Sequence, residues 1–292
     1  MIKYQYSLLF VLTTALSSIL ISATSSLASP ALDLFLSTLI ATLYFHLINY
    51  NKIISLYKKT FQYPASWIGS SVLVGITWLC TFYGTSIMGA FPFIFIYFIV
   101  AAIMGLAVLV MSDKDMSIWQ VVSGICLFGT IILFVFSQLP VTHIYQYWAG
   151  ITFAITAGVA AYFYRKVIFI FTSNTQMTTS QVLALRSYFT LIISACLIKS
   201  TDFTVLDSRV FLHILGISFF ILIFPLYCNQ KGIMKAGPEV HSIIAGSCPF
   251  ITCILQMILI HDIKVSFLIY SFAGSLFLVL PSIIPLLKKV KT

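Results

Sequence analysis

An arginine inside an apolar segment has the clearest potential for chemistry in this sequence. Arg186 lies about eight residues into the apolar run 178–199. Ionisable groups are costly at membrane depth, so they are candidates for function. In a functional role, Arg186 would hold an anionic group of a substrate, or a carboxylate that changes partner between states. In a structural role, it would reach the cytoplasmic interface or pair with helix-end carbonyls. Both interpretations stay open at this stage.

Two titratable residues, Glu239 and His241, begin the apolar run 239–260. A helix start presents free N–H groups and partial positive charge, which a carboxylate complements. Imidazole titrates near neutral pH. The pair is therefore the candidate site for coupling to protons, and complementing the helix start is the alternative role for Glu239.

Prolines and a glycine mark where helices are expected to break. Pro249 lacks an N–H group, and its ring clashes with the carbonyl of Ala245. Gly246 beside it permits close approach of another helix or a ligand, and Pro225 interrupts the run 209–229 in the same way. Backbone freed at membrane depth is tolerated only where it is buried or faces a watery cavity. These two runs are expected to border a cavity, with a simple packing kink as the alternative.

Aromatic and amide side chains within the apolar runs are candidates for binding a substrate. Trp78 and Tyr227 lie deep in their runs. Such a pair on opposite sides of a cavity would hold an amine or a flat ring. Tyr97, Tyr162 and Asn229 are expected to complete the site. Packing in the core is the alternative role for each ring.

No set of residues in the sequence indicates catalysis. It contains no Gly-rich phosphate loop, no H-E-x-x-H motif and no paired aspartates of an intramembrane protease. The six cysteines lie in apolar runs without a C-x-x-C pair, which favours small buried side chains over disulfides or metal ligands. We therefore expect no enzyme activity, no cofactor and no metal. Without an ATP-binding motif, any pumping must use gradients.

Composition indicates a membrane protein. Apolar residues make up 60% of the chain and charged residues 8%, with a mean hydropathy of +1.07. A soluble domain of this length could not cover so much apolar surface. The net charge of +9 is spread in short clusters between apolar runs, so it favours topology signals over binding of nucleic acid.

Ten apolar segments are long enough to span a membrane, which requires roughly 20 residues each. The expected fold is thus an all-α polytopic membrane protein with short connections. Only 51–65 is long enough for a surface segment, an interfacial stretch ended by Pro64. The ten expected spans are 7–23, 31–50, 66–84, 89–111, 117–137, 146–170, 178–199, 209–229, 239–260 and 266–287.

Basic residues predict the orientation of these spans. With the N-terminus in the cytoplasm, twelve Lys and Arg residues fall inside and three outside. Arg165 and Lys166 are counted among the twelve, and Arg186 is the only basic residue assigned to the interior of a span. The positive-inside rule then places both termini in the cytoplasm. A rival interpretation is a signal peptide cleaved after Ala28, which would leave nine spans.

The two halves of the chain are weakly similar. A shift of 149 residues aligns Ser37 with Arg186, Trp78 with Tyr227 and Asp113 with Asp262. Each half holds five apolar runs, and an odd number forces the second copy to enter the membrane from the other side. The prediction is a single transmembrane domain, 1–292, built as a 5+5 inverted repeat of about 1–140 and about 146–292, with a substrate site between the halves.

Two segments resemble the drug/metabolite transporter superfamily, in its EamA-like branch. S-P-A-L-D-L-F-L-S at 29–37 resembles the beginning of that family's second helix, and K-A-G-P-E-V-H-S-I-I-A-G-S-C-P-F-I-T at 235–252 resembles its penultimate helix. The chain departs from the family in having Ser37 where Arg is common, Val100 at the position matching Pro249, and no Trp-Gly pair in the first helix. The family handles many metabolites, so no substrate is carried over.

The resulting expectation is a secondary transporter for a small polar metabolite, an amino acid or related compound, that works by alternating access in a cytoplasmic (inner) membrane. A flippase for a lipid-linked substrate, or a membrane enzyme or accessory subunit without transport, is the alternative. The expected partners are a small-molecule substrate, protons and the lipid bilayer, with no nucleic acid, and the chain is expected to be a monomer or homodimer.

Overall fold

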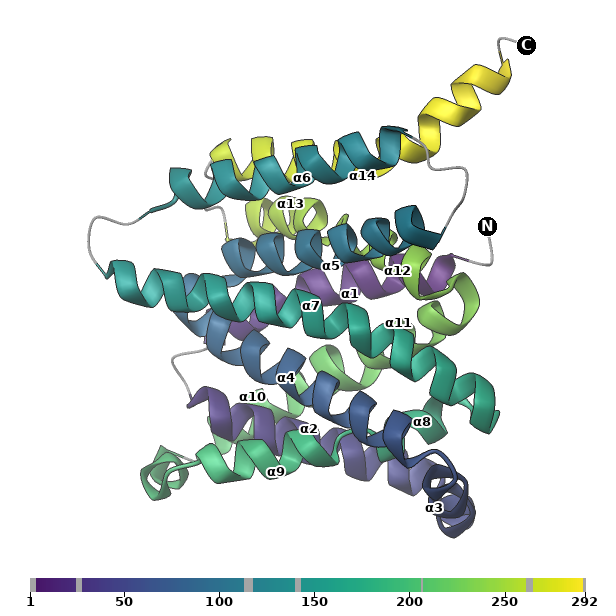
Figure 1. Ribbon diagram of the computed structural model, residues 1–292. Helices are drawn as coiled ribbons and strands as arrows, with labels where there is room; N and C mark the ends of the chain where they lie inside the picture. Colours follow the sequence, from purple (N-terminus) through teal and green to yellow (C-terminus); the bar gives the residue numbers. More distant parts are fainter. Residues whose placement is uncertain are drawn as a thin grey trace.

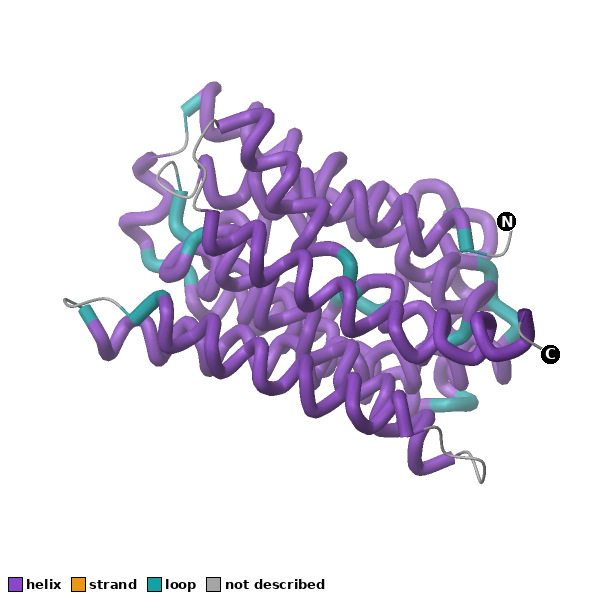
Figure 2. Tube along the Cα trace, turned by 90° about the horizontal axis from the view of Figure 1, so that it is seen from above, coloured by secondary structure: helices purple, strands orange, loops and turns teal. Residues whose placement is uncertain are grey.

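The computed structural model covers the whole chain, and it describes residues 4–24, 28–112, 118–139, 143–205, 207–260 and 265–290. Over these ranges the chain forms helices joined by short turns and contains no strand (Figure 2). The helices of the first half are α1 (Gln5–Thr24), α2 (Pro30–Ile48), α3 (Ile53–Phe61), α4 (Pro64–Met88), α5 (Ala90–Ser112) and α6 (Ile118–Ser137).

The second half begins with the longest helix and continues with shorter pieces. Its helices are α7 (Ile144–Thr175), α8 (Thr179–Leu185), α9 (Tyr188–Leu197), α10 (Ser208–Ile217), α11 (Phe224–Ala236), α12 (Pro238–Ala245), α13 (Cys248–Ile260) and α14 (Val265–Val290). A π-helical turn, Ser218–Ile223, joins α10 to α11, and 3₁₀ turns occupy Tyr50–Lys52 and Ser200–Val205.

Long apolar helices of this kind are those of a protein embedded in a membrane. Within the described ranges, nine helical segments are long and apolar enough to cross a bilayer, and each overlaps one of the expected spans. The tenth expected span, 266–287, lies within α14, of which Val265–Leu278 is an apolar helix. The segment 51–65 contains α3, which buries Leu56 and Thr60 on one face and exposes Lys58 and Lys59. Pro64 is the first residue of α4.

Helix α5 lies at the centre of the bundle. It contacts α1, α4, α6, α7, α12, α13 and α14, and it is the most deeply buried of the apolar helices. Phe91, Phe93, Phe95 and Phe98 are each at most 1% exposed and pack in one apolar cluster. Burying an aromatic side chain of this size stabilises packing strongly, so α5 serves as the framework on which the other helices are placed.

Three of the long segments in the second half are interrupted. The segment of α8 and α9 breaks between Leu185 and Tyr188, and the indole of Trp67 donates a hydrogen bond to the Leu185 carbonyl that the break frees (2.7 Å). The π-helical turn precedes Pro225, and α12 ends at Ala245, four residues before Pro249. Each proline thus stands where its missing N–H and its ring disrupt the preceding turn.

The ends of the helices gather at two opposite ends of the bundle (Figure 1). The start of α1, helix α3, the connection from α11 to α12 and the end of α14 lie at one end, and the starts of α2 and α10 lie at the other. The first end holds Lys58 and Lys59 of α3, and Lys231 and Lys235 of α11. Basic residues from both halves are therefore concentrated at one end of the bundle.

Candidate functional site

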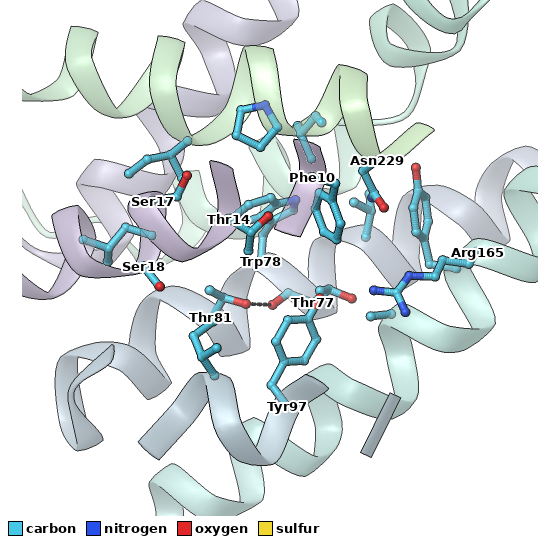
Figure 3. A pocket seen from close by; sticks show the side chains of 18 residues that line it. Phe10, Thr14, Ser17, Ser18, Thr77, Trp78, Thr81, Tyr97, Arg165 and Asn229 are labelled. Atoms are coloured by element: carbon cyan, nitrogen blue, oxygen red, sulfur yellow. Dashed lines mark hydrogen bonds between the residues drawn. The ribbon is translucent and has the colours of Figure 1, made fainter. Parts of the chain in front are cut away.

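A central cavity lies between helices from both halves of the chain. Its wall comes from α1, α4, α5, α7, the π-helical turn and α11, and the space between them that admits a water-sized sphere is about 50 Å³. Figure 3 shows Arg165 and Asn229 on one side of the cavity, and Ser17, Ser18 and Thr81 on the opposite side.

The part of the cavity wall that α1 and α4 contribute is rich in hydroxyl groups. Ser17, Ser18, Thr77 and Thr81 each donate a hydrogen bond of 2.6–2.9 Å to a backbone carbonyl three or four residues earlier in the same helix. A hydroxyl in an apolar helix has few other acceptors, which explains this pattern. Their oxygen lone pairs remain free to accept hydrogen bonds. The Thr14 hydroxyl, also in the wall, is buried without a partner in the described structure.

Arg165 is a buried cation in the cavity wall. Its side chain is 1% exposed, and Nη1 donates a hydrogen bond to Ser242 Oγ (2.9 Å), which in turn donates to the Pro238 carbonyl (2.7 Å). Arg165, which the sequence analysis counts with the cytoplasmic basic residues, is therefore buried inside the bundle. Helix α7 continues to Thr175, so Arg165 lies well inside the helix on the side that faces α12 and the cavity.

Arg186 lies beside the cavity rather than in its wall. It occupies the break between α8 and α9, is 1% exposed, and donates through Nη1 to the Tyr164 hydroxyl. Its Nε and Nη2 have no partner among the described residues. The smaller pocket that Arg186 lines shares Trp78 with the central cavity, and Tyr164 lines the central cavity itself. Tyr164 therefore links Arg186 to the cavity.

His241 is connected to the cavity through Asn229. Its Nε2 lies 2.7 Å from Asn229 Oδ1, and its Nδ1 lies 2.9 Å from Ser7 Oγ. Because an amide oxygen only accepts, Nε2 carries the hydrogen of this bond. The bond occupies the amide oxygen of Asn229, so the amino group of Asn229 is the donor that remains at the cavity wall.

The structure brings some of the expected aromatic residues together and separates others. Trp78 and Tyr97 line the central cavity. Tyr227 is not in its wall, because its hydroxyl accepts a hydrogen bond from Lys231 (2.9 Å) and its ring lies beneath that ammonium group. Tyr162 is fully buried outside the cavity, with its ring 5.9 Å from Lys166 Nζ.

The remaining expected residues lie in three different places. Glu239 forms an ion pair with Lys166 (3.7 Å) that is partly exposed. Pro225 lines the cavity. Gly246 lies where a Cβ atom would be 2.5 Å from a Leu278 methyl group, so it serves close packing between helices, and Pro249 lies in the first turn of α13. In the run 239–260, the helix break therefore allows close packing between helices. His241 of the same run takes part in the hydrogen bonds behind the cavity wall.

The sequence contains a signal for the hydroxyl wall that residue types alone do not reveal. Thr77 and Thr81 are four residues apart, as are Thr14 and Ser18, and this spacing puts each pair on one face of a helix. The role of Arg165 is hidden in the sequence, because the adjacent pair Arg165 and Lys166 resembles a topology signal at the end of a span.

Comparisons with known proteins establish the fold alone. No family model matches the sequence, and no curated protein matches it. A solved crystal structure of a protein is similar over 94% of this chain and 97% of its own, with a TM-score of 0.65 and 14% sequence identity. This bundle of helices is therefore an arrangement that another protein of almost the same length also adopts.

Proposed function

We propose that this protein is a secondary transporter that moves a small polar metabolite across a cytoplasmic membrane by alternating access. The observation that carries the proposal is the cavity lined by helices of both halves, with a buried arginine and hydroxyl groups in a bundle of apolar helices. Polar groups left unpaired in such surroundings cost several kcal/mol, about 2–7 for an amide or hydroxyl, so a polar ligand is the natural occupant.

The helix contacts support a 5+5 inverted repeat of ten spans. If the first five spans correspond in order to the last five, the contact of α1 with α11 has its counterpart in that of α7 with α4. The contact of α1 with α13 likewise matches that of α7 with α5. The pairs α2 with α9, α5 with α12, and α6 with α14 each join counterparts. This exchange is what a pseudo-twofold axis between the halves requires, and it fits membership of the EamA-like drug/metabolite transporters.

The concentration of basic residues at one end supports an orientation with both termini in the cytoplasm. Coupling to protons is the accompanying proposal, with His241 and Glu239 as the groups to test. Glu239→Gln and His241→Ala should alter the pH dependence of uptake into proteoliposomes. If the pH dependence of uptake is unchanged in both variants, the proton site lies elsewhere or the protein transports its substrate by facilitated diffusion.

The test of transport begins with a thermal-shift screen of the detergent-purified protein against a metabolite library, since a ligand that binds only the folded state raises its melting temperature. Trp78→Ala should weaken the response to a hit, because it removes a ring from the cavity wall. Trp148→Ala is the matched control, because Trp148 is 44% exposed on α7. The hit must then be taken up by proteoliposomes containing the protein. Binding without uptake would contradict the transporter proposal.

A further inference from the structure

We propose that the occupant of the central cavity is a small organic anion that also carries hydrogen-bond donors. Its carboxylate or phosphate would bind at Arg165, and its hydroxyl or ammonium groups would face the hydroxyl groups of α1 and α4. The bound anion would be the substrate of the central cavity. Only the word substrate rests on the proposed function, because the anion could bind without being transported.

No carboxylate of the described ranges balances the charge of Arg165. Asp33 lies beside the imidazole of His213 (3.6 Å), and Glu239 beside the ammonium of Lys166 (3.7 Å). The carboxylates of Asp202 and Asp207 accept hydrogen bonds from backbone N–H groups. These four are the acidic residues of the described ranges, and none of them forms an ion pair with either buried arginine.

A second arginine increases the positive charge on the same side. Arg186 is equally buried, its Nε and Nη2 have no partner in the described ranges, and its bond to Tyr164 connects it to the cavity wall. Two buried guanidinium groups without a carboxylate disfavour a cationic ligand and favour an anionic one, because a buried charge needs a partner. The guanidinium fork is also the geometry that grips a carboxylate or phosphate.

Asn229 adds a neutral donor beside Arg165. Its amide oxygen is occupied by His241 Nε2, so its amino group can donate to the same anionic group. Ser242 accepts one N–H of Arg165 and thereby orients the guanidinium. His241 and Ser242 are thus positioning residues, which act on the ligand through Asn229 and Arg165.

The opposite wall has the reverse polarity. The hydroxyl hydrogens of Ser17, Ser18 and Thr81 are used by backbone carbonyls, so these groups offer acceptors to a ligand. An acceptor wall suits hydroxyl or ammonium groups and repels a second carboxylate. Between the two walls, rings such as that of Trp78 cover the carbon skeleton. Figure 3 shows Arg165 apart from Ser17, Ser18 and Thr81, with Thr77 between them.

The test uses pairs of probes that differ in one group, measured by thermal shift and by equilibrium binding to the whole protein. Butyrate is compared with butyramide, and glycerol 3-phosphate with glycerol, so that the two arms distinguish a carboxylate from a phosphate. 4-Hydroxybutyrate and 4-aminobutyrate add a hydroxyl or an ammonium group to butyrate. The anionic member of at least one pair should stabilise the protein and its neutral partner should not, and 4-hydroxybutyrate or 4-aminobutyrate should bind more tightly than butyrate.

Arg165→Gln should weaken binding of the stabilising anion at least tenfold. Arg209→Gln, at an exposed arginine, is the control for loss of surface charge and should leave binding unchanged. If Arg165→Gln does not fold, Arg165→Lys replaces it, and the comparison of anionic with neutral probes on the unaltered protein stands by itself. Equal stabilisation by neutral and anionic probes, no stabilisation by any anion, or unchanged affinity in the Arg165 variant would overturn the inference.

Uptake separates this inference from the proposed function. Anions that bind through Arg165 but are not taken up by proteoliposomes would uphold the anion site and contradict transport. Neutral compounds that are taken up, while no anion binds, would uphold transport and contradict the anion site.

Discussion

Replacement of Gly158 by alanine tests the packing that shapes the cavity. A Cβ at this position of α7 would lie 2.6 Å from the Tyr97 carbonyl oxygen and 2.8 Å from Val100 Cβ. Carbon atoms in good contact lie about 3.5–4.0 Å apart, so the added methyl group is too close by roughly 0.7 Å or more. Both atoms are fixed to the α5 backbone, so rotation of a side chain cannot relieve the overlap and α5 itself must move.

The expected cost is that of an overpacked core, about 1–3 kcal/mol. Replacing glycine with alanine in a helix returns up to about 1 kcal/mol through helix propensity. Gly129→Ala in α6 is the matched control, because its Cβ would meet nothing within 4 Å. The control variant has the same gain in helix propensity but no steric overlap. The free energies of unfolding of the two variants should therefore differ by about 1–3 kcal/mol.

The assay is thermal unfolding of both variants in the same detergent. At about 2–4 °C per kcal/mol for chains of 150–250 residues, Gly158→Ala should melt roughly 5 °C below Gly129→Ala. Displacement of α5 also moves Tyr97, which lines the cavity, so ligand binding should weaken in Gly158→Ala alone. Melting temperatures within a degree of each other would refute the close approach of α5 and α7.

Three further predictions concern other parts of the molecule. In a variant without native cysteines, a cysteine at position 262 should react with an impermeant reagent from outside and a cysteine replacing Lys58 should not; the reverse would overturn the orientation. Trp67→Phe should lower the melting temperature, since it removes the donor to a buried carbonyl at a helix break, worth about 1–3 kcal/mol, and an unchanged value would argue against that bond. Gly232→Ala should also melt lower, because its Cβ would lie 2.7 Å from His241 Nδ1; a melting temperature equal to that of the unaltered protein would contradict this contact.

Hydropathy was sufficient to predict the helical class and the position of the long apolar helices, because lipid demands continuous apolar runs with internally bonded backbone. The breaks near Pro225 and Pro249 follow from the chemistry of proline and could be read from the sequence. The break at Arg186 carries no proline signal. It depends on Trp67, which is distant in sequence and supplies a hydrogen bond to the freed carbonyl.

Placement of the site residues was harder to predict because it depends on how each helix is rotated. Arg165 and Lys166 are neighbours in sequence, yet one lines the cavity and the other is partly exposed beside Glu239. Successive residues point about 100° apart on a helix of 3.6 residues per turn, so one position decides between cavity and solvent. The pairing of Trp78 with Tyr227 assumed equal roles in the two halves, but Lys231 holds Tyr227 away from the cavity.

The interruptions in the second half give the molecule unequal stiffness. An unbroken helix bends only by distorting its ladder of hydrogen bonds, whereas at a break those bonds are already missing. In the described ranges α2, α4 and α5 run without a break, while three apolar segments of the second half are interrupted near Arg186, Pro225 and Gly246. Elastic stress from the surrounding lipid, such as a change in bilayer thickness, would therefore be absorbed mainly by the second half. The first half of the chain would therefore change shape less than the second half under the same stress.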